Sequence, residues 1–176
     1  ENFYDGSFRR YSDFIGTPFE YVSIEKDRVV IDALGEIKGE QSFGAKIEKD
    51  FALLNDGIEF EIKLDSSCDY NLRYVCEFNL HFQNQEEVDI GGLGEIDRHI
   101  FKAQKSIVLK DNSLKREIVI EFDRDVEFFV YQVSTLSQSE SGFDMTKQGY
   151  SIAAVLNYSK KFELKGSMKI RKASNK

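Results

Sequence analysis

Three polar residues at alternate positions of one segment have the chemistry to contact a sugar. Glu77, Asn79 and His81 are spaced two residues apart, so in a β-strand their side chains project from one face. Carboxylate pairs cleave glycosidic bonds, and the chain has 31 Asp and Glu residues from which a pair could come. We interpret the three residues as candidates for lining a sugar-sized groove; a solvated outer strand face is the structural alternative.

A second polar group lies farther along the chain, between two apolar segments. Gln138, Glu140 and Gln148 carry planar amide or carboxylate groups that can pair with neighbouring sugar hydroxyls. The sequence has no Trp, so Phe143 and Tyr150 are the expected rings for stacking on a sugar, with burial in the core as the alternative for each. We expect these polar residues to occupy a long connecting loop. The structural alternative is that these polar side chains form hydrogen bonds to the backbone of the loop and so hold the loop in place.

Metal, nucleotide and nucleophile sites find no support in the sequence. His81 and His99 are the only histidines, and neither has a second ligand at zinc spacing. Asp123 and Asp125 lack the other ligands of a calcium loop, and the glycines of residues 91–94 (GGLG) lack dinucleotide-loop spacing. Neither a GxSxG motif nor a catalytic Cys–His arrangement appears. We therefore expect no metal and no cofactor.

The composition limits the classes of partner. The chain has 176 residues, with 24 Lys and Arg against 31 Asp and Glu, for a net charge of −7. This acidic balance argues against nucleic acid, and the apolar runs are too short for a membrane span. Cys68 and Cys76 are too few for a disulfide framework, so we expect reduced thiols and a cytoplasmic location. Because the chain opens at Glu1 without a leader pattern, we interpret it as an excised piece of a larger protein or a processed product.

Alternating apolar and polar residues predict β-strands along most of the chain. In residues 72–82 (LRYVCEFNLHF) every second residue from Leu72 to Phe82 is apolar, and the residues between them are mostly polar. Similar patterns, or β-branched and aromatic runs, predict strands at 19–25, 28–37, 42–48, 58–64, 100–109, 116–122, 127–136 and 150–171, the last with a turn near 158–161. Asp56-Gly57 predicts a tight hairpin, and a helical turn or two is expected only within 8–15. We predict a single all-β domain, residues 1–176, built as an antiparallel two-sheet sandwich.

Residues 128–156 resemble the closing domain of the α-amylases and 4-α-glucanotransferases of glycoside hydrolase family 57. In that family a strand likewise ends in Ser-Gln-Ser-Glu, here residues 137–140, followed by a Gly, an aromatic and an acidic residue, and then Gln-Gly. Residues 76–80 (CEFNL) and 9–15 (RRYSDFI) are weaker similarities, in the same order as in the family. The chain departs from the pattern at Lys147, where the family has an aromatic residue.

The resemblance implies a galactose-mutarotase-like supersandwich packed beside a separate catalytic (β/α) barrel of the same polypeptide. That barrel opens with a His-x-His motif, which a chain with histidines only at 81 and 99 does not contain. The chain is therefore expected to be a non-catalytic accessory domain of an α-glucan-processing enzyme. It would form a wall of the active-site cleft, contact α-1,4-glucan oligosaccharides, or supply the interface to the barrel and to a second copy in a homo-oligomer.

Two other functions stay open on the residues alone. A mutarotase-like sugar isomerase would use Glu77 or Glu140 as base and His81 as acid on a ring hydroxyl. A free-standing glycan-binding or purely structural sandwich would bind maltooligosaccharides, or nothing, without turnover. Interconversion of glucose anomers separates the isomerase from the other functions.

Overall fold

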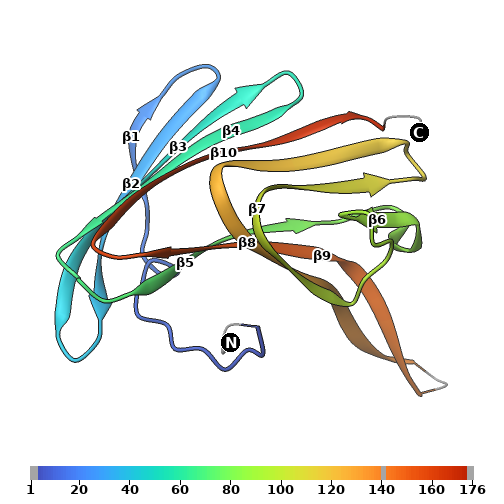
Figure 1. Cartoon of the computed structure of the whole chain (residues 1–176), viewed down its shortest axis with the longest axis horizontal. Coiled ribbons are helices and arrows are strands. Elements are labelled where there is room, and N and C mark those ends of the chain that lie inside the picture. Colours follow the sequence, from blue (N-terminus) through green and yellow to red (C-terminus); the bar gives the residue numbers. More distant parts are fainter. Residues whose placement is uncertain (1–3, 140–141, 174–176) are drawn as a thin grey trace. The chain divides into compact units, whose positions relative to one another are not determined.

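Antiparallel β-strands make up almost all of the protein (Figure 1). The computed structural model describes residues 4–139 and 142–173. The strands in this part are β1 (Glu20–Ile24), β2 (Arg28–Lys38), β3 (Ser42–Leu54), β4 (Gly57–Ser66), β5 (Leu72–Leu80), β6 (Val88–Ile90), β7 (Arg98–Asp111), β8 (Arg116–Ser139), β9 (Gly142–Tyr158) and β10 (Lys161–Lys172). One short 3-10 helix, η1 (Gln85–Glu87), precedes β6. The predicted all-β class is confirmed, and the described residues include no helix of the length and apolarity that crossing a membrane requires.

The chain divides into two compact units. Unit 1 comprises Glu1–Tyr74 and Asn157–Ser167, and unit 2 comprises Val75–Leu156 and Met168–Lys176. Strands β5, β9 and β10 contribute residues to both units. The single domain predicted for residues 1–176 stays a prediction.

The sheet of unit 1 has the order β1-β2-β3-β4-β10. The turn between Leu54 and Gly57 joins β3 to β4, as Asp56-Gly57 predicted. In β2, β3, β4 and β10 buried residues share one face of the sheet, because the pleat sends every second side chain to the same side. The buried side chains of this face include Ala33, Ile37, Ala45, Ile47, Phe60, Ile62, Leu64 and Leu164. Strand β1 is the edge of this sheet, and all five of its residues are exposed.

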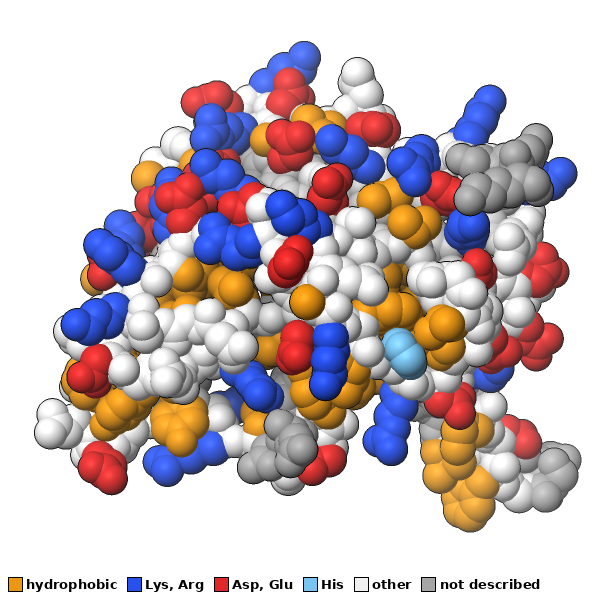
Figure 2. All heavy atoms as spheres, viewed as in Figure 1, with side chains coloured by type: hydrophobic (Ala, Val, Ile, Leu, Met, Phe, Trp, Pro, Cys, Tyr) orange, Lys and Arg blue, Asp and Glu red, His pale blue; other side chains and the backbone are white. Residues whose placement is uncertain are grey.

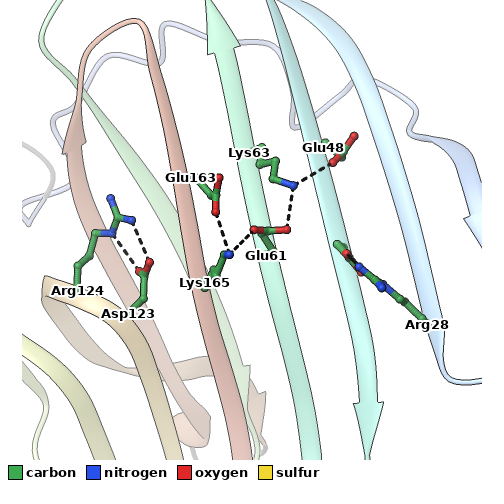
Figure 3. A network of polar contacts seen from close by, with 9 residues as sticks. Arg28, Glu48, Glu61, Lys63, Asp123, Arg124, Glu163 and Lys165 are labelled. Atoms are coloured by element: carbon green, nitrogen blue, oxygen red, sulfur yellow. Dashed lines mark hydrogen bonds and ion pairs between the residues drawn. The ribbon is translucent and has the colours of Figure 1, made fainter.

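The opposite face of the unit 1 sheet is covered by ion pairs (Figure 3). Glu61 on β4 is bonded by Lys63 of its own strand at 2.9 Å and by Lys165 of β10 at 3.0 Å. Lys63 also pairs with Glu48 of β3, and Lys165 with Glu163. Charges of opposite sign therefore alternate across neighbouring strands, which favours this register over one shifted by a residue.

These ion pairs predict an acid-sensitive stability. The bonds from Lys63 and Lys165 lower the pKa of Glu61 from its ordinary 4.5 to about 2. A carboxylate whose pKa is lower in the folded state stabilises the fold above its unfolded pKa, and this stabilisation is lost as the pH falls through the folded value. We expect the urea concentration at the midpoint of unfolding to decrease as the pH is lowered from 5 to 2. In the double variant Lys63→Met, Lys165→Met this decrease should be about half as large. The single variant Lys172→Met, at the exposed end of β10, is the control. An unchanged pH dependence in the double variant would contradict the prediction.

Unit 2 is built around the long strand β8. The first part of β8 lies between β10 and β7, and β6 completes that side of the sheet. Farther along, β8 pairs with β9 from Glu127↔Val155 to Ser139↔Gly142, and β9 pairs with β5. The core of this unit includes Leu109, Ile120, Phe122, Phe128, Val130, Ile152 and Ala154. Phe122 packs on Phe128 with ring centroids 5.8 Å apart.

The structure corrects three expectations about local structure. The strands predicted at 116–122 and 127–136 are one continuous strand, β8, which runs on to Ser139. Residues 137–139 and 142–148 therefore belong to strands and not to a long loop: the chain enters β9 at Gly142, and Thr135, Thr146 and their neighbours pair across a hairpin. Residues 8–15 form no helix; Ser12 instead makes an isolated bridge to Ile37.

Candidate functional site

A row of three polar side chains crosses strands β5, β9 and β8 of unit 2. Tyr131 and Ser151 are register partners on β8 and β9. The Oε1 atom of Glu77, on β5, accepts hydrogen bonds from the Tyr131 hydroxyl at 2.5 Å and from the Ser151 hydroxyl at 2.5 Å. Burial, together with the bond to Glu77, raises the pKa of the Tyr131 phenol, which keeps it a donor. An exposed carboxylate is thus held in one orientation by the half-buried Tyr131 and the buried Ser151.

Next to this row, His81 and Gln148 are brought together. The Nδ1 atom of His81 donates to the backbone oxygen of Gln148 at 2.6 Å, since a carbonyl oxygen can only accept. The side-chain Nε2 of Gln148 donates to the Thr135 hydroxyl at 3.0 Å. Gln148 is the extra residue of a β-bulge, because the register steps from Val133↔Gly149 to Ser134↔Lys147. Both predicted residues therefore hold the base of the β8–β9 hairpin.

Tyr150 belongs to the core of unit 2. Its side chain is 1% exposed, and its ring lies edge-on to Phe82 with centroids 6.3 Å apart. Burial raises the pKa of its phenol, whose oxygen lies 3.5 Å from the Nε2 donor of Gln132. A buried ring has no free face for a sugar to stack on. Tyr150 is therefore a core residue, the alternative considered for it in the sequence.

The remaining described residues of the prediction lie on β5, β8 and β9. Gln138 and Phe143 are register partners near the end of the hairpin. Phe143 is seven residues from Tyr150 along β9, a separation of about 23 Å. Asn79 is exposed on β5, whereas Glu140 lies outside the described residues. Of the seven described residues, Glu77, Asn79, His81 and Gln148 belong to β5 and the hairpin base, Tyr150 belongs to the core, and Gln138 and Phe143 belong to the hairpin end.

The geometry does not favour Glu77 and His81 as an acid–base pair on one hydroxyl. Four residues of extended chain separate them, or about 13 Å, which exceeds the reach of two groups acting on one oxygen. Among the described residues no three His, Cys, Asp or Glu side chains are grouped so that they could hold a metal ion. Asp123, considered above for calcium, is paired with Arg124 at 3.0 Å (Figure 3).

Comparison with known proteins decides the family. The family model described as "Alpha-amylase/4-alpha-glucanotransferase, C-terminal" matches residues 1–170. The chain belongs to this family. The resemblance drawn from residues 128–156 is therefore confirmed, over nearly the whole chain.

Curated relatives of this C-terminal family are much longer than the chain. The α-amylase of Pyrococcus horikoshii is 28% identical over 169 residues, which are 93% of this chain and 24% of that protein. The 4-alpha-glucanotransferase of Thermococcus litoralis is 26% identical over 156 residues, 89% of this chain and 22% of that protein. The chain thus spans about a quarter of the length of these relatives.

Solved structures confirm the mutarotase-like fold of this family member. The crystal structure of the Thermococcus litoralis 4-alpha-glucanotransferase matches with a TM-score of 0.81 at 24% identity, over 96% of this chain and 25% of that one. A putative aldose 1-epimerase from Escherichia coli K12 matches with a TM-score of 0.63 at 9% identity, over 88% of this chain and 68% of that one. A galactose mutarotase related enzyme from Lactobacillus acidophilus matches with a TM-score of 0.52 at 13% identity, over 90% of this chain and 72% of that one. At these identities the likeness shows the fold alone.

Sequence analysis missed the partners of Glu77 and one further feature of this C-terminal domain. Tyr131 and Ser151 stand 54 and 74 residues from Glu77, and only the strand order brings them to it. Unit 2 also has a surface depression of about 410 Å³. Its lining includes Glu117, whose side chain is 4% exposed and accepts from the Nε of Arg171 at 2.9 Å. A buried carboxylate paired with an arginine has no local sequence signature.

Proposed function

We propose that the chain is a non-catalytic accessory domain of an α-glucan-processing enzyme of the α-amylase or 4-α-glucanotransferase type. It acts beside a catalytic (β/α) barrel of the same polypeptide, on which it packs. The observation that carries this proposal is the family match over residues 1–170. The length of the relatives supports it, since about three quarters of each lies outside the region that this chain matches.

The Glu77 row supports a second part of the proposal, a contact with oligosaccharide. An ionised carboxylate offers lone pairs to sugar hydroxyls, and fixing it by Tyr131 and Ser151 reduces the entropy lost on binding. Asn79 lies exposed two residues away on the same face of β5 and offers both a donor and an acceptor. Gln138 and Phe143, near the end of the hairpin, lie apart from the Glu77 row and are not included in this proposed contact.

Activity measurements test the accessory role. The full-length polypeptide that contains this chain should convert maltoheptaose, whereas the 176-residue chain alone should neither convert it nor interconvert glucose anomers. A version of the polypeptide that lacks this chain should lose at least about tenfold in kcat/KM, since the barrel would lose its packing surface. Conversion by the chain alone, or full activity without it, would overturn the proposal.

Calorimetric titration tests the oligosaccharide contact. We expect the chain to bind maltotriose to maltoheptaose with a Kd of about 1 mM, the strength of a few exposed hydrogen bonds. The variant Glu77→Gln should weaken that binding about tenfold while circular dichroism stays unchanged, because an amide accepts less strongly than a carboxylate. Glu121→Gln, an exposed carboxylate on β8, is the matched control. Equal binding by both variants would remove Glu77 from the proposed contact.

Two further expectations belong to the same proposal. The chain has two cysteines, Cys68 and Cys76, which are too few for a disulfide framework, and this supports a reducing compartment such as the cytoplasm. The remaining expected partner is a second copy of the parent enzyme in a homo-oligomer, and the molar mass of the full-length polypeptide from light scattering tests this expectation. A monomer would limit the partners of this chain to the barrel and the glucan.

A further inference from the structure

The distal hairpin, residues 133–139 and 142–148, exposes large apolar side chains on one of its faces. Leu136 and Met145 are register partners, and Phe143 pairs with Gln138 two residues farther out on the same side. Leu136 is 65% exposed, Phe143 72% and Met145 73%. In Figure 2 hydrophobic side chains gather near the end of this hairpin, at the lower right of the view. We call these three residues the apolar face.

The distal hairpin is a ribbon of two strands. In the described part of the chain β7 pairs with β8 only as far as Tyr131, and β5 ends at Leu80, beside Gly149. The other side of the ribbon carries Thr135 and Thr146, which pair directly. An isolated two-stranded ribbon is marginally stable in water, so an apolar face on one side of it is expected to be covered.

The base of the ribbon is firmly anchored. Lys147 forms an ion pair with Glu95, and this pair lowers the pKa of Glu95. The bonds of Gln148 to Thr135 and His81 lie beside it. The apolar face is therefore presented in a fixed direction relative to the sheet of unit 2, which lowers the entropy cost of docking.

We propose that the apolar face docks on the catalytic part of the same polypeptide. This inference rests on the proposed accessory function and names the surface through which it works. A stable dimer of free chains buries about 1,200–2,000 Å², whereas three side chains expose an area on the order of a few hundred Å². A patch of that size suffices for a tethered partner, because a covalent link supplies an effective concentration in the millimolar range.

The chemistry of the apolar face fits a protein surface better than a glucan. Two of its three side chains, Leu136 and Met145, are aliphatic and offer neither a flat ring nor a hydrogen bond to a sugar. Met also adapts its shape to an irregular apolar partner. The polar threonine side of the ribbon then stays in contact with solvent.

Hydrogen–deuterium exchange of the full-length polypeptide, compared with the 176-residue chain, tests the inference. We expect amides of the distal hairpin to exchange at least about tenfold more slowly in the full-length polypeptide, since docking suppresses local opening. Slower exchange elsewhere in the chain without any change in the hairpin would overturn the inference and leave the accessory function standing. Equal exchange throughout would overturn both.

Two matched pairs of substitutions locate the docking face. The variant Leu136→Lys, Met145→Glu puts opposite charges on register partners of the apolar face, and Ser137→Lys, Asp144→Glu does the same one step away on the other face. Both variants place a lysine opposite a glutamate across the two strands. In the full-length polypeptide only the first variant should return hairpin exchange to the rate of the 176-residue chain. If the hairpin amides of the first variant still exchanged slowly, or if both variants lost the slow exchange, docking by the apolar face would be contradicted.

Discussion

Replacing Gly149 by alanine is expected to cost the chain about 3 kcal/mol or more of folding free energy. Gly149 has a φ of +153°, a conformation that side chains with a Cβ rarely adopt. An added Cβ would lie 2.2 Å from the backbone oxygen of Leu80, and a backbone atom cannot rotate away. Because small domains are stable by only about 5–15 kcal/mol, this variant should show a much lower urea midpoint or fail to fold.

Two other glycines separate the two causes of this effect. Gly142 has a φ of +134° but open space around its Cβ position, so alanine there should cost only the backbone strain, about 1–2 kcal/mol. Gly44 in β3 has open space and no positive φ, so Gly44→Ala should be neutral or stabilise by up to about 1 kcal/mol. If Gly149→Ala were as stable as Gly142→Ala, the close approach of β9 to Leu80 would be contradicted.

The second large effect is expected at the pair formed by Glu117 and Arg171. Removing the cation with Arg171→Met leaves a carboxylate in a nearly dry position, which is the costly way to break a buried pair. The Arg171 side chain is itself 57% exposed, so solvent screens part of the loss, and we expect about 2 kcal/mol rather than the 3–5 kcal/mol of a fully buried pair. Urea unfolding at pH 7 measures it.

A second substitution at the same pair tests the cause. In the background Glu117→Gln the carboxylate is gone, so Arg171→Met should cost no more than about 0.5 kcal/mol there. Lys102→Met, an exposed cation on β7, is the control for a general change of net charge. Equal costs of Arg171→Met in both backgrounds would show that the arginine acts through packing and not through Glu117.

Most strands were predictable from the alternation of apolar and polar residues. In residues 72–80 the apolar positions face the interior and Glu77 and Asn79 are exposed, as the period of two requires. The hairpin at Asp56-Gly57 followed from turn chemistry that acts within a few residues. Such local signals suffice for the fold class because each strand carries its own pattern.

The distal hairpin was predicted as a loop because many of its residues are polar. Ser, Gln and Asp are frequent in loops, yet here Leu136, Phe143 and Met145 alternate with polar neighbours at strand spacing. An exposed ribbon has no buried face, so the hydrophobic signal that marks other strands is weaker there. The alternation of Phe143, Asp144, Met145 and Thr146 was the available clue.

The site was only partly predictable for a different reason. Glu77 could be selected from its spacing with Asn79, but its bonds to Tyr131 and Ser151 depend on β5, β9 and β8 lying in that order. Tyr150 and Phe143 have similar chemistry in the sequence and opposite burial in the structure. Burial depends on which strands lie alongside, and a single sequence does not specify these neighbours.

The charged face of unit 1 affects how the chain should respond to heat. The stabilisation from apolar burial levels off as the temperature rises, whereas the cost of removing water from charges falls. The alternating charges of Glu48, Lys63, Glu61 and Lys165 therefore contribute relatively more to folding in warm solution than in cold. Added salt should accordingly reduce the free energy of unfolding of this chain more near its melting temperature than at room temperature.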